Sequence, residues 1–266
     1  MLLWHQLKTD RGSALIDQPR QSRLLVPFGS KDWSPDRVSI SEDTSGQLEF
    51  DCPVTHVVLD IAAKTPLRLN SDWYRLFNRP PMRELTSAKA QFNFIKEHMP
   101  GYCDVWGKFQ QIFLTLYFDF VVSQIEAHKP ELEQKLADMS SLFSYQDWLL
   151  SAFMPLPQPL LYVPDDPADY SYADEDMIRL PLMFWTGDQA IIVFFRGNET
   201  RSAKIINLQE RLRENGFVIL EIDQQKLTNC EVSVIREILP GEFHKFWQSE
   251  VLPSGPFKPE FGDPVF

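Results

Sequence analysis

Carboxylates in the second half of the chain have the chemistry needed to hold a metal ion. Asp147 lies in SYQDWLLSAF, an acidic run ends at Asp176, and Asp188 lies in the turn TGDQ. Clustered carboxylates bind Mg²⁺, which promotes phosphodiester hydrolysis. Asp147 together with Asp176 or Asp188 is therefore a candidate catalytic set that could hold a metal ion. The alternative for the acidic run is a solvated loop.

Positive charges form a second candidate site around residue 200. Cations on one helix face contact phosphates in nucleic-acid-binding proteins. An ordinary solvated face is the alternative, with Glu210 and Glu214 pairing with cations three or four residues away. The formal charge of −11 favours that alternative, because non-specific nucleic-acid binding depends on neutralising phosphates. The candidate nucleic-acid-binding residues are Arg196, Arg201, Lys204 and Arg211.

The elements that would position these residues follow one another in a regular order. The apolar runs MIRLPLMFW and AIIVFFRG flank the turn TGDQ, which predicts a hairpin. A helix from Thr200, with Ala203, Ile206 and the run Leu208–Leu212 on its buried side, is expected to end at Gly216. The strand GFVILEID and the helix QQKLTNCEVSVIREIL follow.

Two short elements are expected before the hairpin. Ser144 is placed to cap a helix over Tyr145–Phe153, and Leu160–Val163 has the composition of a strand. After the hairpin unit, Glu242–Glu250 is expected to form a last short helix.

Residues 144–239 resemble the very-short-patch-repair branch of the PD-(D/E)XK nucleases in this order of elements. SYQDWLLSAF stands for the first helix of that family, LPLMFWTGDQAIIVFFRG for its hairpin, and RLRENGFVILEI for its helix-to-strand passage. The resemblance implies an α/β fold of the restriction-endonuclease type, with a mixed sheet flanked by helices. A β-rich region and a helical region precede this core.

The resemblance also implies that the metal-binding carboxylates are lost. Their positions fall on Pro181 or Leu182, on Phe194, and, for the same-face polar residue, on Arg196. A phenyl ring cannot bind a metal ion, and a guanidinium repels one. We therefore expect a catalytically inactive nuclease-like subunit that binds or scaffolds, with no cofactor. The alternative is an active metal-dependent DNA or RNA endonuclease, in which the migrated acidic residues Asp147 and Asp176 or Asp188 hold Mg²⁺. Prokaryotic DNA processing or defence is the setting that the resemblance suggests.

Four regions are expected along the chain. Residues 1–82 contain short β-favouring runs, and residues 83–140 are expected to be helical, beginning with the helical spacing of Ala88, Phe92, Ile95 and Met99. The nuclease-like core covers 141–250, and a tail rich in proline and phenylalanine covers 251–266. A second helix, apolar around much of its circumference, is expected over about 104–128 and a third near Pro130.

Composition bears on compartment and partners. The three cysteines are far apart and form no CxxC pair, which favours a reducing, cytoplasmic setting. The longest apolar run, Ile112–Val122, is too short to span a membrane. The apolar second helix and the aromatic tail predict a protein partner or a homo-oligomer, with nucleic acid as a further partner through the cationic face.

Overall fold

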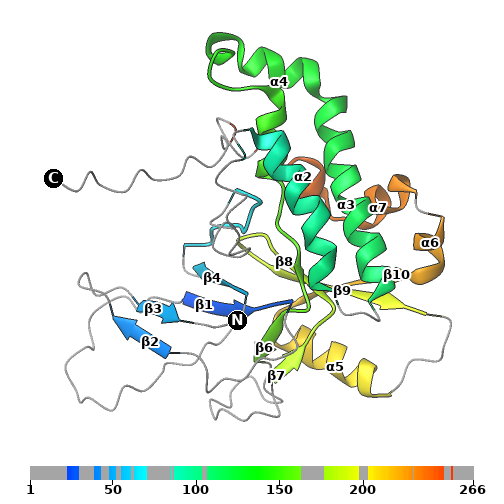
Figure 1. The fold of residues 1–266 in the computed structure, drawn as a ribbon. Helices are drawn as coiled ribbons and strands as arrows, with labels where there is room; N and C mark the ends of the chain where they lie inside the picture. Colours follow the sequence, from blue (N-terminus) through cyan, green and yellow to red (C-terminus); the bar gives the residue numbers. More distant parts are fainter. Residues whose placement is uncertain are drawn as a thin grey trace. The chain divides into compact units, whose positions relative to one another are not determined.

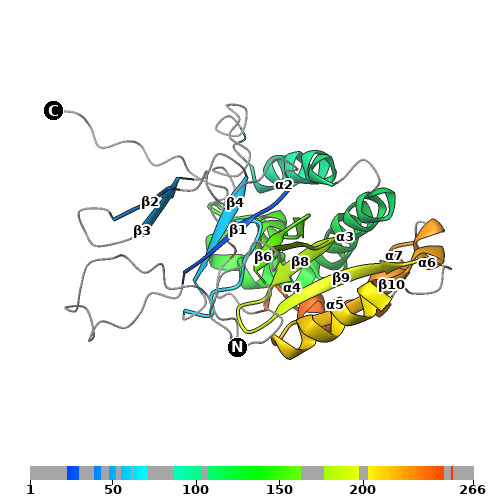
Figure 2. The ribbon, with the colours of Figure 1, turned by 90° about the horizontal axis from the view of Figure 1, so that it is seen from below.

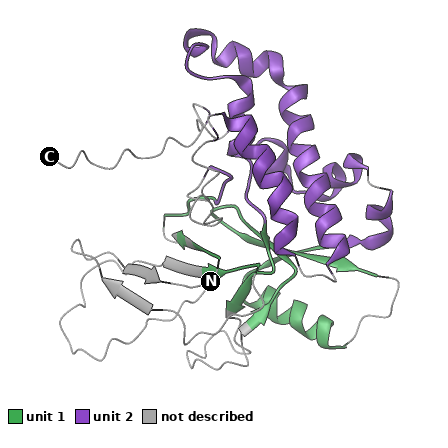
Figure 3. Cartoon of the chain, in the orientation of Figure 1, with its two compact units in different colours: residues 1–66, 156–221 green, residues 67–155, 222–266 purple. Residues whose placement is uncertain are grey.

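The computed structural model describes the chain in segments. These are residues 23–29, 39–42, 48–51, 55–60, 63–70, 85, 87–103, 107–162, 177–197, 203–229, 231–248 and 253. They form a mixed α/β fold, as expected, with a four-stranded mixed sheet, several smaller sheets and helices (Figure 1). Two compact units are present, residues 1–66 with 156–221 and residues 67–155 with 222–266 (Figure 3).

The N-terminal strands of the first unit form two antiparallel pairs. Strand β1 (Arg23–Pro27) pairs with β4 (His56–Asp60), and β2 (Ser39–Glu42) pairs with β3 (Leu48–Asp51). Val26, Phe28, Val57 and Leu59 are buried. These four strands lie within residues 1–82, the region expected to be β-rich.

The main sheet has the order β10-β9-β8-β5. Its strands are β5 (Leu156–Pro157), β8 (Leu182–Trp185), β9 (Ala190–Arg196) and β10 (Val218–Asp223). Strand β8 is antiparallel to both β5 and β9, and helix α5 (Ala203–Glu214) connects β9 to β10. The expected hairpin, helix and strand are confirmed. The last two residues of β10 belong to the second compact unit.

The segment MIRLPLMFW is not one strand, contrary to the prediction. Its first part, β7 (Met177–Arg179), pairs with β6 (Leu160–Tyr162), and only the part after Pro181 pairs with β9. Proline has no amide hydrogen to donate to a strand partner, so the chain changes partner there. The Pro181 carbonyl accepts a hydrogen bond from the backbone N–H of Gln158 (3.0 Å).

Helix α5 buries a smaller part of its surface than its sequence predicts. Of its residues only Gln209 and Leu212 are buried, while Ala203 is exposed and Ile206 is 38% exposed. The expectation that Ala203 and Ile206 lie on the buried side is therefore wrong. The helix contributes a single short buried stripe, so most of its side chains remain open to solvent.

The second unit is helical and centres on one apolar helix. Helix α2 (Ala88–His98) is followed by the short helix η3 (Met99–Tyr102) and by α3 (Lys108–Ala127). Ala88, Phe92, Ile95 and Met99 are all buried, which confirms the helical spacing. The Oγ of Ser87 accepts a hydrogen bond from the N–H of Ala90 (3.2 Å) and caps α2. Nine residues of α3 are buried, so it forms the centre of this unit.

Short helices complete the second unit. They are α4 (Lys129–Lys135), η4 (Ala137–Met139), η5 (Tyr145–Ser151), α6 (Gln224–Thr228), α7 (Val232–Ile238) and η7 (Gly241–His244). Pro130 lies in the first turn of α4, as predicted. The single helix expected over QQKLTNCEVSVIREIL is two helices, and the last helix ends at His244 rather than Glu250.

The two compact units do not follow the consecutive regions expected from sequence. Each unit takes one stretch from the first part of the chain and one from a later part. Local sequence patterns carry no information about such long-range pairing. No helix among the described residues is long and apolar enough to cross a membrane.

Candidate functional site

The open end of the β8–β9 hairpin is where the resemblance places a metal site. The paired register ends at Leu182↔Val193, and the next residues at this end of the hairpin are Pro181 and Phe194. Side chains at directly opposed positions of an antiparallel pair are about 5 Å apart, close enough for two carboxylates to share a metal ion. The chain has a proline and a half-buried phenylalanine there, followed by the exposed Arg196 at the end of β9.

Asp188 lies at the opposite end of this hairpin. The register from Leu182↔Val193 to Trp185↔Ala190 covers three residues of strand, or about 10 Å. The carboxylate of Asp188 pairs with the Nζ of Lys64 (3.1 Å), and both side chains are largely exposed. Asp188 is therefore too far along the hairpin to join a metal ion bound at the level of Phe194.

The hairpin turn is held against residues 64–66 of the same unit. The indole N–H of Trp185 donates to the carbonyl of Thr65 (2.8 Å). Gly187 has φ of +98°, and a β-carbon built on it would lie 2.2 Å from the carbonyl oxygen of Lys64. Only glycine fits this position, so the turn is built for close packing on its neighbour.

Asp147 has a local structural role. It lies in the first turn of η5, and its Oδ2 accepts a hydrogen bond from the backbone N–H of Ser144 (2.7 Å), as part of a capping box. The residue is 8% exposed, and burial raises the pKa of its carboxyl group, while the hydrogen bonds from Ser144 act in the opposite direction. This carboxylate already has a partner at the helix start. The N-cap predicted at Ser144 is confirmed.

Two of the candidate residues cannot be placed. Asp176 and Arg201 lie outside the described residues. In the described ranges, no three or more histidine, cysteine, aspartate or glutamate side chains come together as a possible metal site. The remaining candidate residues are Lys204 and Arg211 on α5.

Lys204 and Arg211 line a hollow along α5. Figure 1 shows β7 beside this helix, and Figure 2 shows the helix from below. Lys204 and Arg211 are seven residues apart, which is two helical turns, so they lie on the same side of the helix. The hollow has a volume of about 540 Å³. Its lining residues are Ile178, Lys204, Asn207, Leu208, Glu210, Arg211 and Glu214.

The lining of this hollow is balanced in charge. Lys204 and Arg211 supply two positive charges, and Glu210 and Glu214 supply two negative ones. Leu208 and Ile178 provide an apolar floor, and the Asn207 amide offers both a hydrogen-bond donor and an acceptor. Asn207 and Leu208 lie three and four residues after Lys204, so helical spacing alone predicts that they share its side of the helix. Ile178 comes from a different element and has no such signal in the sequence.

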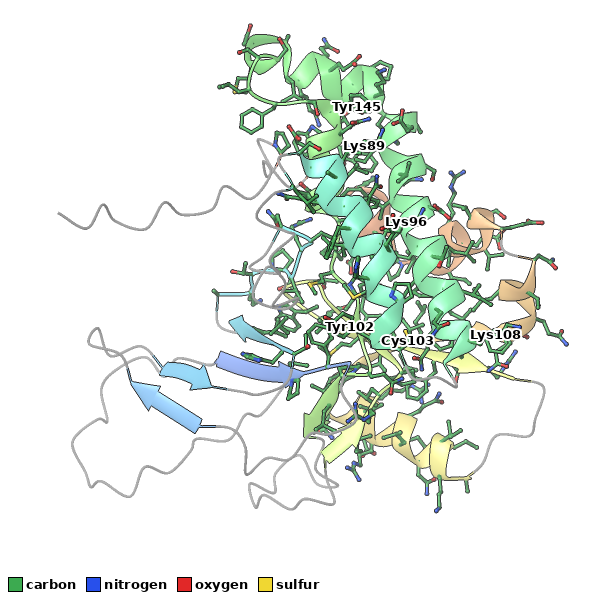
Figure 4. All side chains as sticks on the ribbon, viewed as in Figure 1. Lys89, Lys96, Tyr102, Cys103, Lys108 and Tyr145 are labelled. Atoms are coloured by element: carbon green, nitrogen blue, oxygen red, sulfur yellow. The ribbon has the colours of Figure 1, made fainter. Side chains whose placement is uncertain are left out.

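The helical unit has lysines on the side of α2 and α3 seen in Figure 4. Lys89 and Lys108 are exposed, and Lys96 pairs with Asp119 on α3 (2.5 Å). Lys129 lies over the ring of Tyr145, 4.8 Å from its centroid. The ion pair with Asp119 neutralises the charge of Lys96.

Arg68 is a buried cation of the helical unit. It is 8% exposed, donates to the backbone carbonyls of Ser151 and Phe246, and lies over the ring of Phe153, 5.0 Å from its centroid. It therefore joins three distant segments of the chain. These bonds to backbone give Arg68 a structural role.

Compared with models of protein families, with curated proteins and with solved structures, the chain matches none.

Proposed function

We propose that this protein is a non-catalytic subunit with a nuclease-like core, which binds or scaffolds other macromolecules. The observation that carries the proposal is the register of the hairpin, which ends at Leu182↔Val193 and leaves Pro181 and Phe194 as the next residues at its open end. In the PD-(D/E)XK enzymes that the sequence resembles, carboxylates occupy these positions. Neither side chain here can bind Mg²⁺, which needs oxygen ligands.

The fold order supports the same proposal. A hairpin followed by a helix and a fourth strand, in the sheet order β10-β9-β8-β5, agrees with the order of elements in that family. Asp147 and Asp188, the described acids that could replace the lost ligands, are engaged in a helix cap and a surface ion pair. We further propose a cytoplasmic setting, because the cysteines form no CxxC pair.

The proposal is tested with the full-length protein, Mg²⁺ or Mn²⁺, and plasmid DNA, single-stranded DNA and RNA as substrates. We expect no cleavage above that of a parallel preparation of Asp147→Asn. Cleavage that is metal-dependent and disappears in Asp147→Asn or Asp188→Asn would establish the endonuclease alternative and overturn the proposal.

A gain-of-function variant tests the position of the vacated site. Pro181→Asp combined with Phe194→Glu puts two carboxylates on the residues that follow the last pair of the hairpin, Leu182↔Val193. We expect this variant to bind Mn²⁺ in a calorimetric titration, whereas the wild type does not. Pro181→Asn with Phe194→Gln is the matched control, since it has the same shape without the charge. Equal Mn²⁺ binding by both variants would contradict the assignment.

A further inference from the structure

We draw no further inference here: the strongest candidate, the apolar surface at the N-terminal end of α5, where Ile205 is 44% exposed and Ile206 is 38% exposed, carries none because nothing in the described part of the chain shows what covers it.

Discussion

At the scale of single residues, Asp147 shows how a buried acid can belong to the fold rather than to catalysis. Its carboxylate accepts a hydrogen bond from the backbone N–H of Ser144 at the start of η5. Asp147→Ala removes this acceptor and is expected to lower the free energy of unfolding by about 1 kcal/mol at neutral pH. Asp147→Asn keeps an acceptor oxygen and is expected to cost less. Chemical denaturation of the two variants checks the order, and equal stabilities would contradict the capping role.

The same carboxyl group predicts a pH dependence. Burial raises its pKa in the folded state, so the folded protein holds this proton more tightly than the unfolded chain. Its contribution to stability therefore falls as the pH rises from about 4, the ordinary value for an aspartate, through the raised pKa. Asp147→Asn is expected to flatten the stability profile in this window. An unchanged profile in the variant would show that another group causes the slope.

Cys103 offers a second prediction at this scale. Burial raises the pKa of its thiol to about 12, which leaves very little thiolate at pH 8. Alkylation of Cys103 by iodoacetamide is expected to be at least roughly a hundredfold slower in the folded protein than after denaturation. Mass spectrometry of the peptide containing Cys103 measures both rates. Equal rates would mean that the thiol is accessible and ionised in the fold.

At the scale of elements, the turn between β8 and β9 depends on Gly187. Alanine there needs an unfavourable positive φ and collides with the Lys64 carbonyl, so Gly187→Ala is expected to destabilise the protein by more than about 1 kcal/mol. Gly101→Ala is the matched control, because a β-carbon there has no atom within 4 Å and Gly101 has no positive φ. Thermal unfolding of both variants compares them. A similar loss at both positions would show that the turn tolerates a side chain.

Much of the element order could be predicted from the sequence, because the signals are local. Helical spacing predicted α2, the capping residue Ser144 predicted η5, and the two apolar runs around TGDQ predicted the hairpin. The errors concern partners that lie far away in the chain. The composition of the run around Pro181 predicts one strand, but the chain changes partner at this proline. Ile206 was expected on the buried side of α5 and is exposed, because the helix buries only a narrow stripe. The lining of the hollow combines α5 with Ile178 of β7, a pairing that periodicity within one segment cannot reveal.

At the scale of the whole molecule, the C-terminal stretch completes the helical unit. Phe243 contacts the rings of Tyr117 and Phe153, and the ring of Trp247 lies 4.4 Å from that of His128. Replacing one buried phenylalanine with alanine costs about 3–5 kcal/mol, a large part of the 5–15 kcal/mol that stabilises a typical protein. Phe243→Ala is therefore expected to reduce the hydrogen-exchange protection of α3. Leu142→Ala, at a position 75% exposed, is the control and leaves it unchanged.

The interleaving of the two units has a consequence for biosynthesis. Residues 67–155 emerge from the ribosome well before 222–248. The later segment contains the contact partners of Arg68, Tyr117 and Phe153. Since the chain is synthesised at roughly 5–20 residues per second, the apolar surface of α3 stays uncovered for several seconds or more before its partners are made. Nascent chains stalled near residue 221 are thus expected to recruit chaperones at α3, and full-length chains released from the ribosome are expected to lose them.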